Sequence, residues 1–187
     1  YTRGHSKRVS ELAAAIAVKM GLEKEEVQDI RCCGLLHDIG KLGVPDPVLS
    51  KAAVLSESEY DVVKLHPVTG ERIVNAVTSL RKLGSGIRHH HERVDGKGYP
   101  DHLAGTAIDK KALIVGTADA LDAMLSDRPY RKAYRPEKAA EEIRKGIGTQ
   151  FDGDVALALL SLLEGGELPV SVSLQPEWDS ASLAVMR

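Results

Sequence analysis

The stretch Leu35-Leu36-His37-Asp38-Ile39-Gly40-Lys41 places two strong metal ligands side by side where an apolar run ends. Adjacent helix residues point about 100° apart, so neighbouring side chains can share one ion only at the edge or the end of a helix. We expect Gly40 to supply that end. An imidazole beside a carboxylate suits iron, manganese or zinc, but the same pair is also typical of a capping aspartate beside a buried histidine. The stretch alone leaves both interpretations open.

The composition is that of an ordinary soluble protein. The chain has 187 residues, which suits one domain with a substantial core. Apolar residues make up 43%, charged residues 28%, and the formal net charge is -2, so no partnership with nucleic acid is indicated. No apolar run is long enough to cross a membrane. We expect a cytoplasmic domain without membrane contact, and because Tyr1 is not a methionine we expect it to begin inside a longer chain.

The two cysteines, Cys32 and Cys33, are adjacent and lie in a helical apolar pattern. Neighbouring cysteines rarely form a disulfide with each other. We therefore expect small core residues in a reducing compartment, with a pair of soft metal ligands as the alternative.

Apolar residues recur at helical spacing through nearly the whole chain, and no convincing alternating strand appears before the C-terminal segment. The predicted fold class is therefore all-α, a multi-helix bundle with the site between helices. From Gly165 onward, glycines, prolines and scattered Val and Ser predict a loosely packed tail or a short extended segment. We divide the chain into a domain over 1–165 and a tail over 166–187. Helices are expected at about 5–20, 23–37, 56–66, 67–77, 80–91, 109–125, 136–147 and 155–163.

His5 and His66 lie at predicted helix ends. His5 falls in the first turn of the first helix. Pro67 disfavours a helical conformation in the residue before it and can start the next helix, which should turn Val74 and Val77 inward. From this junction the side chain of His66 can reach inward as a metal ligand. A solvent-exposed helix cap is the alternative.

His90 and His91 follow the apolar face set by residues 80–87. Counting on from that face by three and four residues reaches both histidines, whereas His89 falls toward solvent and is excluded. The loop over 92–100 contains two glycines and a proline. We interpret this loop as a wall or gate of the site, with a plain surface connection as the alternative.

Asp119 and Asp122 share a helix face with Ala112 and Val115. An aspartate on an apolar face is costly unless it is paired or bound to metal. Asp119 therefore has a reason to meet the histidines, and Asp122 is expected to support a ligand from behind. The basic turn Arg128-Pro129-Tyr130-Arg131 follows, and guanidinium groups near a metal centre suit phosphate oxygens; a solvated turn is the alternative.

The candidate ligands can be assigned to two neighbouring ions, with Asp38 bridging them. The first group is His5, His37, Asp38 and Asp119, and the second group is His66, His90 and His91. This assignment uses five of the seven histidines and explains an aspartate on a buried face, whereas a chance scatter of core histidines explains neither. Two adjacent cations would lower the pKa of a water held between them and make it a nucleophile.

An ordered set of motifs also carries a resemblance. The motifs are Thr2-Arg3-Gly4-His5-Ser6, His37-Asp38-Ile39-Gly40-Lys41, His66-Pro67-x-x-Gly70, His90-His91-Glu92-x-x-Asp95-Gly96-x-Gly98-Tyr99-Pro100, Asp119-x-x-Asp122-Ala123 and Arg128-Pro129-Tyr130-Arg131. With them the chain resembles the HD-GYP domain family, a branch of the HD superfamily of metal-dependent phosphohydrolases. The resemblance covers nearly the whole chain up to about residue 165.

The resemblance implies a helical HD-domain bundle and a bacterial signalling hydrolase that opens cyclic di-GMP to pGpG, with some members continuing to GMP. Members that bind three metals have a glutamate four residues before the first histidine, where this chain has Tyr1. We therefore expect two metal ions, iron or manganese. The implied partners are diguanylate cyclase (GGDEF) domains, met through the Gly98-Tyr99-Pro100 loop, and an upstream sensor or receiver domain. A homodimer is a further expectation.

Asp38 and Lys41 are expected to act in catalysis, and Lys41, Tyr99, Arg128 and Arg131 to contact the substrate. Lys41 either balances charge on the phosphoryl oxygens or protonates the leaving oxygen. Two alternative functions stay open. One is a hydrolase of another cyclic dinucleotide, such as cyclic GMP-AMP, or of a nucleotide phosphate. The other is a module that binds cyclic di-GMP or a cyclase domain without hydrolysis.

Overall fold

The computed structural model describes residues 4–51, 53–127 and 132–173. Within these ranges the chain forms helices and two isolated bridges but no strand, which confirms the all-α prediction. Short 3-10 segments are η1 (Ile39–Gly43), η2 (Thr78–Leu83) and η3 (Gly105–Ala107). The α-helices are α1 (His5–Lys19), α2 (Lys24–Leu36), α3 (Asp46–Leu49), α4 (Glu57–Val63), α5 (His66–Asn75), α6 (Gly84–Arg88), α7 (Lys110–Leu125), α8 (Pro136–Gly146), α9 (Gly153–Gly165) and α10 (Val170–Ser173).

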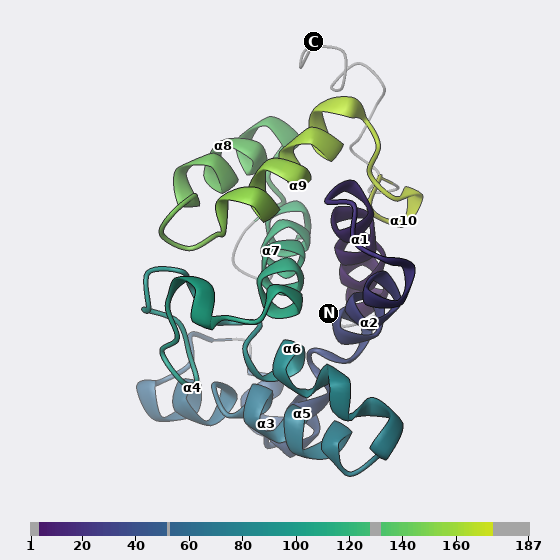
Figure 1. Ribbon diagram of the computed structural model, residues 1–187. Helices are drawn as coiled ribbons and strands as arrows, with labels where there is room; N and C mark the ends of the chain where they lie inside the picture. The colour runs from purple at the N-terminus through teal and green to yellow at the C-terminus, as the bar shows by residue number, and fades with distance from the viewer. Residues whose placement is uncertain (1–3, 52, 128–131, 174–187) are drawn as a thin grey trace.

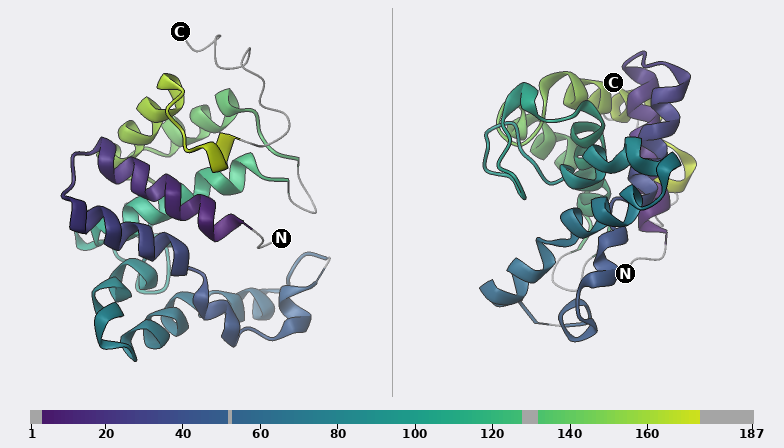
Figure 2. Two further views of the ribbon diagram at one scale, coloured as in Figure 1. Left: turned by 90° about the vertical axis from the view of Figure 1, so that its right-hand side faces the viewer. Right: turned by 60° about the horizontal axis from the view of Figure 1, so that its bottom comes forward.

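Helices α1, α2 and α7 form the middle of the molecule. α1 packs along α2 and against α7, and α2 also contacts α7. Helices α8 and α9 lie at one end of α7, whereas α3 to α6 gather around the other end (Figures 1 and 2). Chain segments that are far apart in the sequence are thereby brought together between α1, α2, α5 and α7.

The core follows the apolar faces read from the sequence. Burying one large aliphatic side chain contributes about 1.5–3 kcal/mol, so a contiguous set of them accounts for the close packing of α1, α2, α7 and α9. The largest fully buried apolar side chains are Leu12, Ile16, Ile30, Leu83, Ile87, Ile114, Leu121, Leu125, Ile143, Leu159 and Leu163.

Helix starts also follow their sequence signals. Ser56 Oγ accepts a hydrogen bond from the backbone N–H of Glu59 at 3.3 Å, and the Glu59 carboxylate accepts one from the N–H of Ser56 at 2.6 Å. This is the predicted capping box of α4. Pro67 and Pro136 lie in the first turns of α5 and α8, where the missing N–H costs nothing because no helical carbonyl is available there.

The segment between α5 and His90 differs from the two helices predicted at about 67–77 and 80–91. Val77 is extended (φ -108°, ψ 113°) and 48% exposed, so the prediction that it points inward is wrong. The helical spacing fails because α5 ends at Asn75, and the chain then forms η2 and the short α6. His90 and His91 follow the end of α6, and His90 is still only 2% exposed.

The two cysteines have different surroundings. Cys33 is buried, its Sγ lies 3.6 Å from the carbonyl oxygen of Leu83, and burial raises the pKa of its thiol to about 12. Cys32 is exposed, so the predicted core position is correct for Cys33 and wrong for Cys32. Neither cysteine belongs to a candidate metal-ligand group among the residues that the structure describes.

The segment after α9 is packed rather than loose. Gly166 ends α9 in the left-handed conformation at φ 66°, which glycine adopts without steric cost. The chain then turns back, and Leu168 and Val172 join the hydrophobic core. The expected loose tail is therefore wrong for residues 166–173, because apolar side chains return directly after the turn. The division at 165 stays a prediction.

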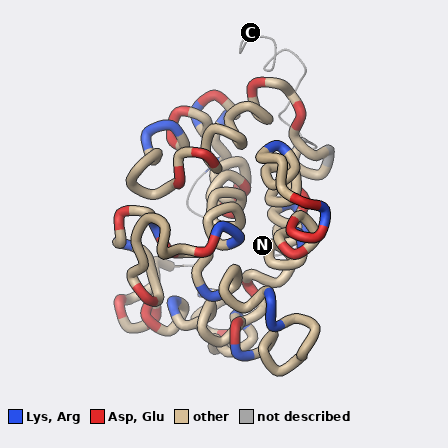
Figure 3. The backbone as a smooth tube through the Cα atoms, viewed as in Figure 1, with Lys and Arg blue, Asp and Glu red and all other residues tan. Residues whose placement is uncertain are grey.

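Charged residues of both signs are distributed along the whole described backbone (Figure 3). Several form ion pairs one helical turn apart, such as Lys138 with Glu142 at 2.8 Å in α8. Such exposed pairs contribute little to stability, because solvent screens their charges. None of the described helices combines the length and the apolar character that a membrane span needs.

Gly40 determines how closely η1 approaches α5. We expected it to end α2, but α2 ends at Leu36 and Gly40 lies inside η1 without a positive φ. A Cβ atom at Gly40 would lie 1.9 Å from the carbonyl oxygen of His66 and 2.5 Å from the backbone nitrogen of Gly70. Only glycine fits this contact, which holds the turn after α2 against the start of α5.

Gly40→Ala is expected to lower the free energy of unfolding by about 1–3 kcal/mol, the usual cost of overpacking, and to push His66 away from Asp38. Urea unfolding measures the first effect. Gly153→Ala in α9 is the matched control, because a Cβ there would meet only Ile147 Cγ2, at 3.9 Å. Equal stabilities of the two variants would contradict this account of Gly40.

Candidate metal centre

Side chains from several elements converge where α1, α2, α5 and α7 meet. His5 comes from α1, His37 and Asp38 from the turn directly after α2, His66 from the start of α5, His90 and His91 from the chain after α6, and Asp119 from α7. Their ligand atoms form three overlapping groups, each within 4.8 Å. The groups are His5 with His37 and Asp119, His66 with His90 and His91, and His37 with Asp38 and His90. The cluster thus brings together all the histidines and aspartates that the sequence assigned to the two ligand groups.

The first group is arranged around the carboxylates of Asp38 and Asp119. Asp119 Oδ1 lies 3.4 Å from His5 Nε2 and 3.9 Å from His37 Nε2. Asp38 Oδ2 lies 3.7 Å and 3.5 Å from the same two nitrogens. Two carboxylate oxygens and two imidazole nitrogens therefore face one small volume.

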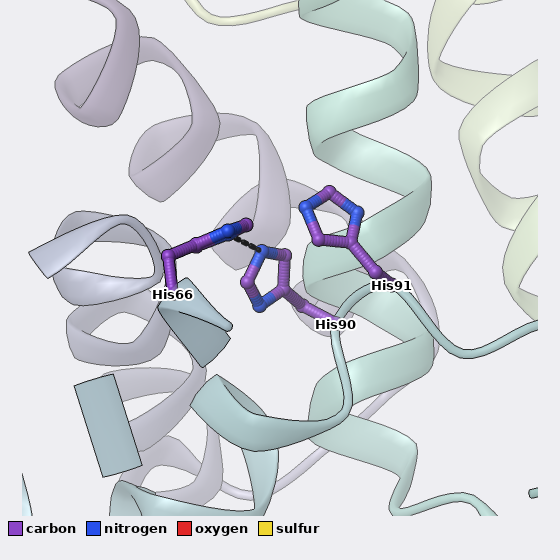
Figure 4. Close-up of side chains that lie close together, drawn as sticks. All are labelled: His66, His90 and His91. Carbon is purple, nitrogen blue, oxygen red and sulfur yellow. Dashed lines mark hydrogen bonds between the residues drawn. The ribbon is translucent and has the colours of Figure 1, made fainter. Parts of the chain in front are cut away.

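The second group lies on the other side of Asp38. His66 Nε2 is 3.4 Å from Asp38 Oδ1 and 3.3 Å from His90 Nε2. In Figure 4 the rings of His66 and His90 point toward each other, with His91 beside them. Because the two oxygens of Asp38 face different groups, this carboxylate is placed between them, as a bridging ligand would be.

Backbone carbonyls fix the orientation of three histidines. The Nδ1 atoms of His37, His66 and His90 each donate a hydrogen bond to the carbonyl oxygen three residues earlier, at 2.8, 2.7 and 2.7 Å. A carbonyl can only accept, so in each neutral ring the proton lies on Nδ1 and the lone pair on Nε2. All three lone pairs are then available to the site.

These lone pairs repel one another unless a cation lies between them. His66 Nε2 and His90 Nε2 are 3.3 Å apart, yet neither carries a proton in the tautomer that the carbonyls impose. Burial lowers the pKa of His66, His90 and His91, so a proton is disfavoured as the bridging charge. His37 Nε2 is buried without a hydrogen-bond partner within the described ranges. Neutral imidazoles and carboxylates are a suitable donor set for a divalent transition metal, and the residues fit such an ion.

Asp122 supports His5 from behind, as we expected. Its Oδ2 accepts a hydrogen bond from His5 Nδ1 at 2.7 Å. Arg8 was missed in the sequence, although it lies three residues after His5 on one helix face. It donates to both oxygens of Asp122, at 2.5 Å from Nε and 3.0 Å from Nη2, and to Ser126 Oγ at 3.2 Å. Burial acts to raise the pKa of Asp122, but these donors outweigh it and lower that pKa.

The carboxylates around His5 attract positive charge. Burial acts to lower the pKa of His5, but the hydrogen bond with Asp122 and the nearby charge of Asp119 outweigh it and raise that pKa. The same negative surroundings that favour a proton on His5 Nε2 would favour a metal cation in its place. The raised pKa is therefore consistent with a cation site at this end of the cluster.

Lys41 and Tyr99 lie at the edge of the cluster. Lys41 Nζ lies 2.6 Å from Asp38 Oδ2. Burial acts to raise the pKa of Asp38, but the imidazole of His37 and the ammonium of Lys41 hold it well below its usual range. The Tyr99 ring lies 4.7 Å from the His91 ring, and burial raises the pKa of Tyr99, which keeps its hydroxyl protonated.

A cavity of about 400 Å³ adjoins the cluster. His91, Tyr99 and Asp119 line it, together with Lys97 and Gln150. The loop over 92–100 thus forms part of a cavity wall. Two residues that we expected to bind substrate, Arg128 and Arg131, lie outside the described residues, as does Tyr130 between them.

Comparison with known proteins places the chain in a family. Residues 2–155 match the family model described as "HD domain". The cyclic di-GMP phosphodiesterase response regulator RpfG of Xanthomonas campestris pv. campestris is 41% identical over 161 residues, which cover 85% of this chain and 43% of that protein. The 3'3'-cGAMP-specific phosphodiesterase 3 of Vibrio cholerae is 36% identical over 87% of this chain and 35% of its own length. The chain therefore spans less than half the length of either relative.

The fold matches as well. The structure of Bd1817, described as a HDG"Y"P protein from Bdellovibrio bacteriovorus, superposes with a TM-score of 0.69 at 25% identity, over 86% of this chain and 52% of that one. This match agrees with the helical arrangement and with the ordered motifs of the sequence. The chain belongs to the HD domain family, in its HD-GYP branch.

Proposed function

We propose that this chain hydrolyses a phosphodiester bond of cyclic di-GMP, to pGpG and/or GMP, with two divalent metal ions. The observation that carries the proposal is the pair of ligand groups that share Asp38, whose two oxygens lie 3.5 Å from His37 Nε2 and 3.4 Å from His66 Nε2. The name of the 41% identical relative, a cyclic di-GMP phosphodiesterase, supports the choice of substrate.

We assign the first ion to His5, His37, Asp38 and Asp119, and the second to His66, His90, His91 and the other oxygen of Asp38. Iron or manganese suits a set of imidazoles and carboxylates without thiolates. Two such ions supply a water of lowered pKa and positive charge for the phosphoryl oxygens.

The remaining chemistry is proposed for the chain's own residues. Asp38, held ionised beside Lys41, keeps the two ligand groups at a fixed separation. The Lys41 ammonium lies close enough to the cluster to balance negative charge on a phosphoryl group or to protonate the leaving oxygen. On the sequence evidence, Arg128 and Arg131 add guanidinium groups that suit phosphate oxygens.

The cavity beside His91 suits part of a nucleotide. Its volume of about 400 Å³ accommodates a purine base with its sugar, and the aromatic side chain of Tyr99 is among its lining residues. Lys97, from the loop that lines the cavity, adds positive charge for an anionic substrate. These features suit a cyclic dinucleotide whose phosphate reaches the cluster while one base enters the cavity.

A second cyclic dinucleotide is a specific alternative. The 36% identical relative is named a 3'3'-cGAMP-specific phosphodiesterase, so hydrolysis of 3'3'-cyclic GMP-AMP is the runner-up. We also propose GGDEF cyclase domains, an upstream sensor or receiver domain and a second copy of the chain as partners, on the family resemblance.

The first test follows the hydrolysis of both cyclic dinucleotides. Protein purified without oxygen is supplied with ferrous or manganous ion, its metal content is counted, and the products are separated by chromatography. We expect pGpG or GMP from cyclic di-GMP. Faster turnover of 3'3'-cyclic GMP-AMP would favour the runner-up, and metal-loaded protein that binds but does not cleave either compound would overturn the proposed hydrolase.

Asp38→Ala is expected to lower kcat on the order of 100-fold or more and to reduce the bound metal, because each proposed ion position loses one carboxylate oxygen. Steady-state kinetics and metal analysis on the same sample measure the two effects. Asp46→Ala in α3 is the control, since this aspartate is exposed and outside the cluster. Full activity in Asp38→Ala would rule out the assignment of the site.

Asp122→Asn is expected to weaken the affinity for metal by about 10- to 100-fold, because the variant removes the charge that orients His5 and leaves Arg8 without its carboxylate. Metal titration of the metal-free protein measures the dissociation constant. Asp61→Asn, at a side chain that is 67% exposed on α4, is the matched control. An unchanged affinity in Asp122→Asn would show that His5 needs no support from Asp122.

A further inference from the structure

His91 is held differently from the other histidines of the cluster. His5, His37, His66 and His90 each have an Nδ1 hydrogen bond to a carboxylate or a carbonyl. Across the described part of the chain, no hydrogen bond to the His91 ring is found. Its orientation must therefore come from packing, because rotation of an imidazole about χ2 is broad and only weakly restricted on its own.

Aromatic rings enclose the imidazole of His91. The Tyr99 ring lies 4.7 Å away at an interplanar angle of 30°, the His90 ring lies 4.0 Å away at 44°, and the His66 ring lies 5.1 Å away at 79°. His66 and His90 are themselves candidate ligands on the same side as the proposed second ion. Tyr99 is thus the non-ligand ring in contact with His91, and it is positioned to set the plane of the imidazole.

The backbone places Tyr99 against His91. The N–H of Tyr99 donates a hydrogen bond to the carbonyl oxygen of His91 at 3.2 Å. Gly98 allows this approach, since a Cβ there would lie 2.4 Å from Glu92 Cα and 2.6 Å from the His91 carbonyl oxygen. The loop therefore folds back onto the residue whose side chain it contacts.

The far end of the loop is anchored as well. The buried carboxylate of Glu92 accepts hydrogen bonds from the backbone N–H of Asp101 at 2.6 Å and of Leu103 at 3.1 Å. Asp101 in turn accepts two hydrogen bonds from Arg88, at 2.6 and 2.8 Å, and one from His89 Nε2 at 2.9 Å. His89, which lies outside the metal cluster, thus joins the loop to the chain directly before His90.

We propose that Tyr99 is a positioning residue for His91, and that the anchored loop over 92–103 holds it there so that the second ligand group is complete. This inference rests on the proposed function, because it needs an ion at His66, His90 and His91. It assigns to the ring of Tyr99, rather than to its hydroxyl, the task that a carbonyl or carboxylate performs for the other histidines. Partners of metal-bound histidines typically change metal affinity by 10- to 100-fold.

The test is a titration of metal-free protein with manganous ion. The electron paramagnetic resonance signal reports the concentration of free ion at each step, and no activity is measured. The wild type is expected to show two binding steps. His66→Ala identifies the step that belongs to the second group. Tyr99→Leu is expected to weaken that step by about 10-fold and to leave the other step unchanged, whereas Tyr99→Phe, which keeps the ring, should match the wild type.

Two further variants make the result specific. Glu92→Gln keeps the Tyr99 ring but loosens the loop, so we expect it to weaken the same step by a smaller factor. If Tyr99→Leu fails to fold, as judged by circular dichroism, the inference is tested by Glu92→Gln. Unchanged metal binding at both steps in that variant would then overturn it. Tyr60→Leu is the control for loss of another ring that lines the same cavity, since among the described residues the half-exposed Tyr60 ring on α4 contacts Lys64 and stacks on no histidine ring.

The outcomes separate this inference from the proposed function. A wild type with two steps and a Tyr99→Leu variant with both steps unchanged would overturn the inference alone. Equal weakening of both steps in Tyr99→Leu would also overturn it, because a general loss of structure would then explain the effect. A wild type that binds a single ion would overturn the two-metal proposal together with this inference.

Discussion

Hydrogen bonds from imidazole Nδ1 atoms to carbonyl oxygens three residues earlier decide what this site can bind. They place the protons of His37, His66 and His90 on the far side of each ring, so that unprotonated nitrogens face one another at distances as short as 3.3 Å. Burial opposes protonation of His66 and His90. Removing this repulsion requires a positive charge from elsewhere, and the carboxylates of Asp38 and Asp119 favour the same charge. The hydrogen bonds to the backbone and the burial of the imidazoles therefore both favour a metal cation over a proton at this site.

Close backbone approach gives the site its dimensions. At Gly40 the chain after α2 touches the start of α5, and at Gly116 a Cβ would lie 2.3 Å from the carbonyl oxygen of His90. Each contact brings one element that carries ligands near another. The hydrogen bonds between Arg8 of α1 and Asp122 of α7 hold a third pair of elements together beside His5. Small residues and a partly buried ion pair thus both fix distances between helices.

Helical periodicity was sufficient to predict the fold class and the convergence of the ligands. The apolar face of α7 correctly carried Asp119 and Asp122 inward, because a 16-residue helix keeps its spacing along its length. Prediction failed where helices are short. Val77 lies beyond the end of α5 and is exposed, and no local signal marks that end.

Features that depend on the tertiary structure were not visible in the sequence. The role of Gly40 comes from its contact with the backbone of α5, and the role of Glu92 from N–H groups of residues 101 and 103. Arg8 carried a usable signal, its spacing from His5, but nothing in the sequence showed that Asp122 would also accept hydrogen bonds from Arg8. Contacts between distant segments are what the structure adds to the pattern.

The origin of the ligands in separate segments has a consequence for folding. His5 and Asp119 lie 114 residues apart in the sequence, yet their ligand atoms are 3.4 Å apart. An ion held by both, and by the turn after α2, would close long loops of chain that are open in the unfolded state. Its binding free energy would then add to the stability of the folded domain in proportion to the logarithm of the metal concentration. Metal supply would in this way set how often α1 and α7 separate, and with it how long the folded chain survives a protease.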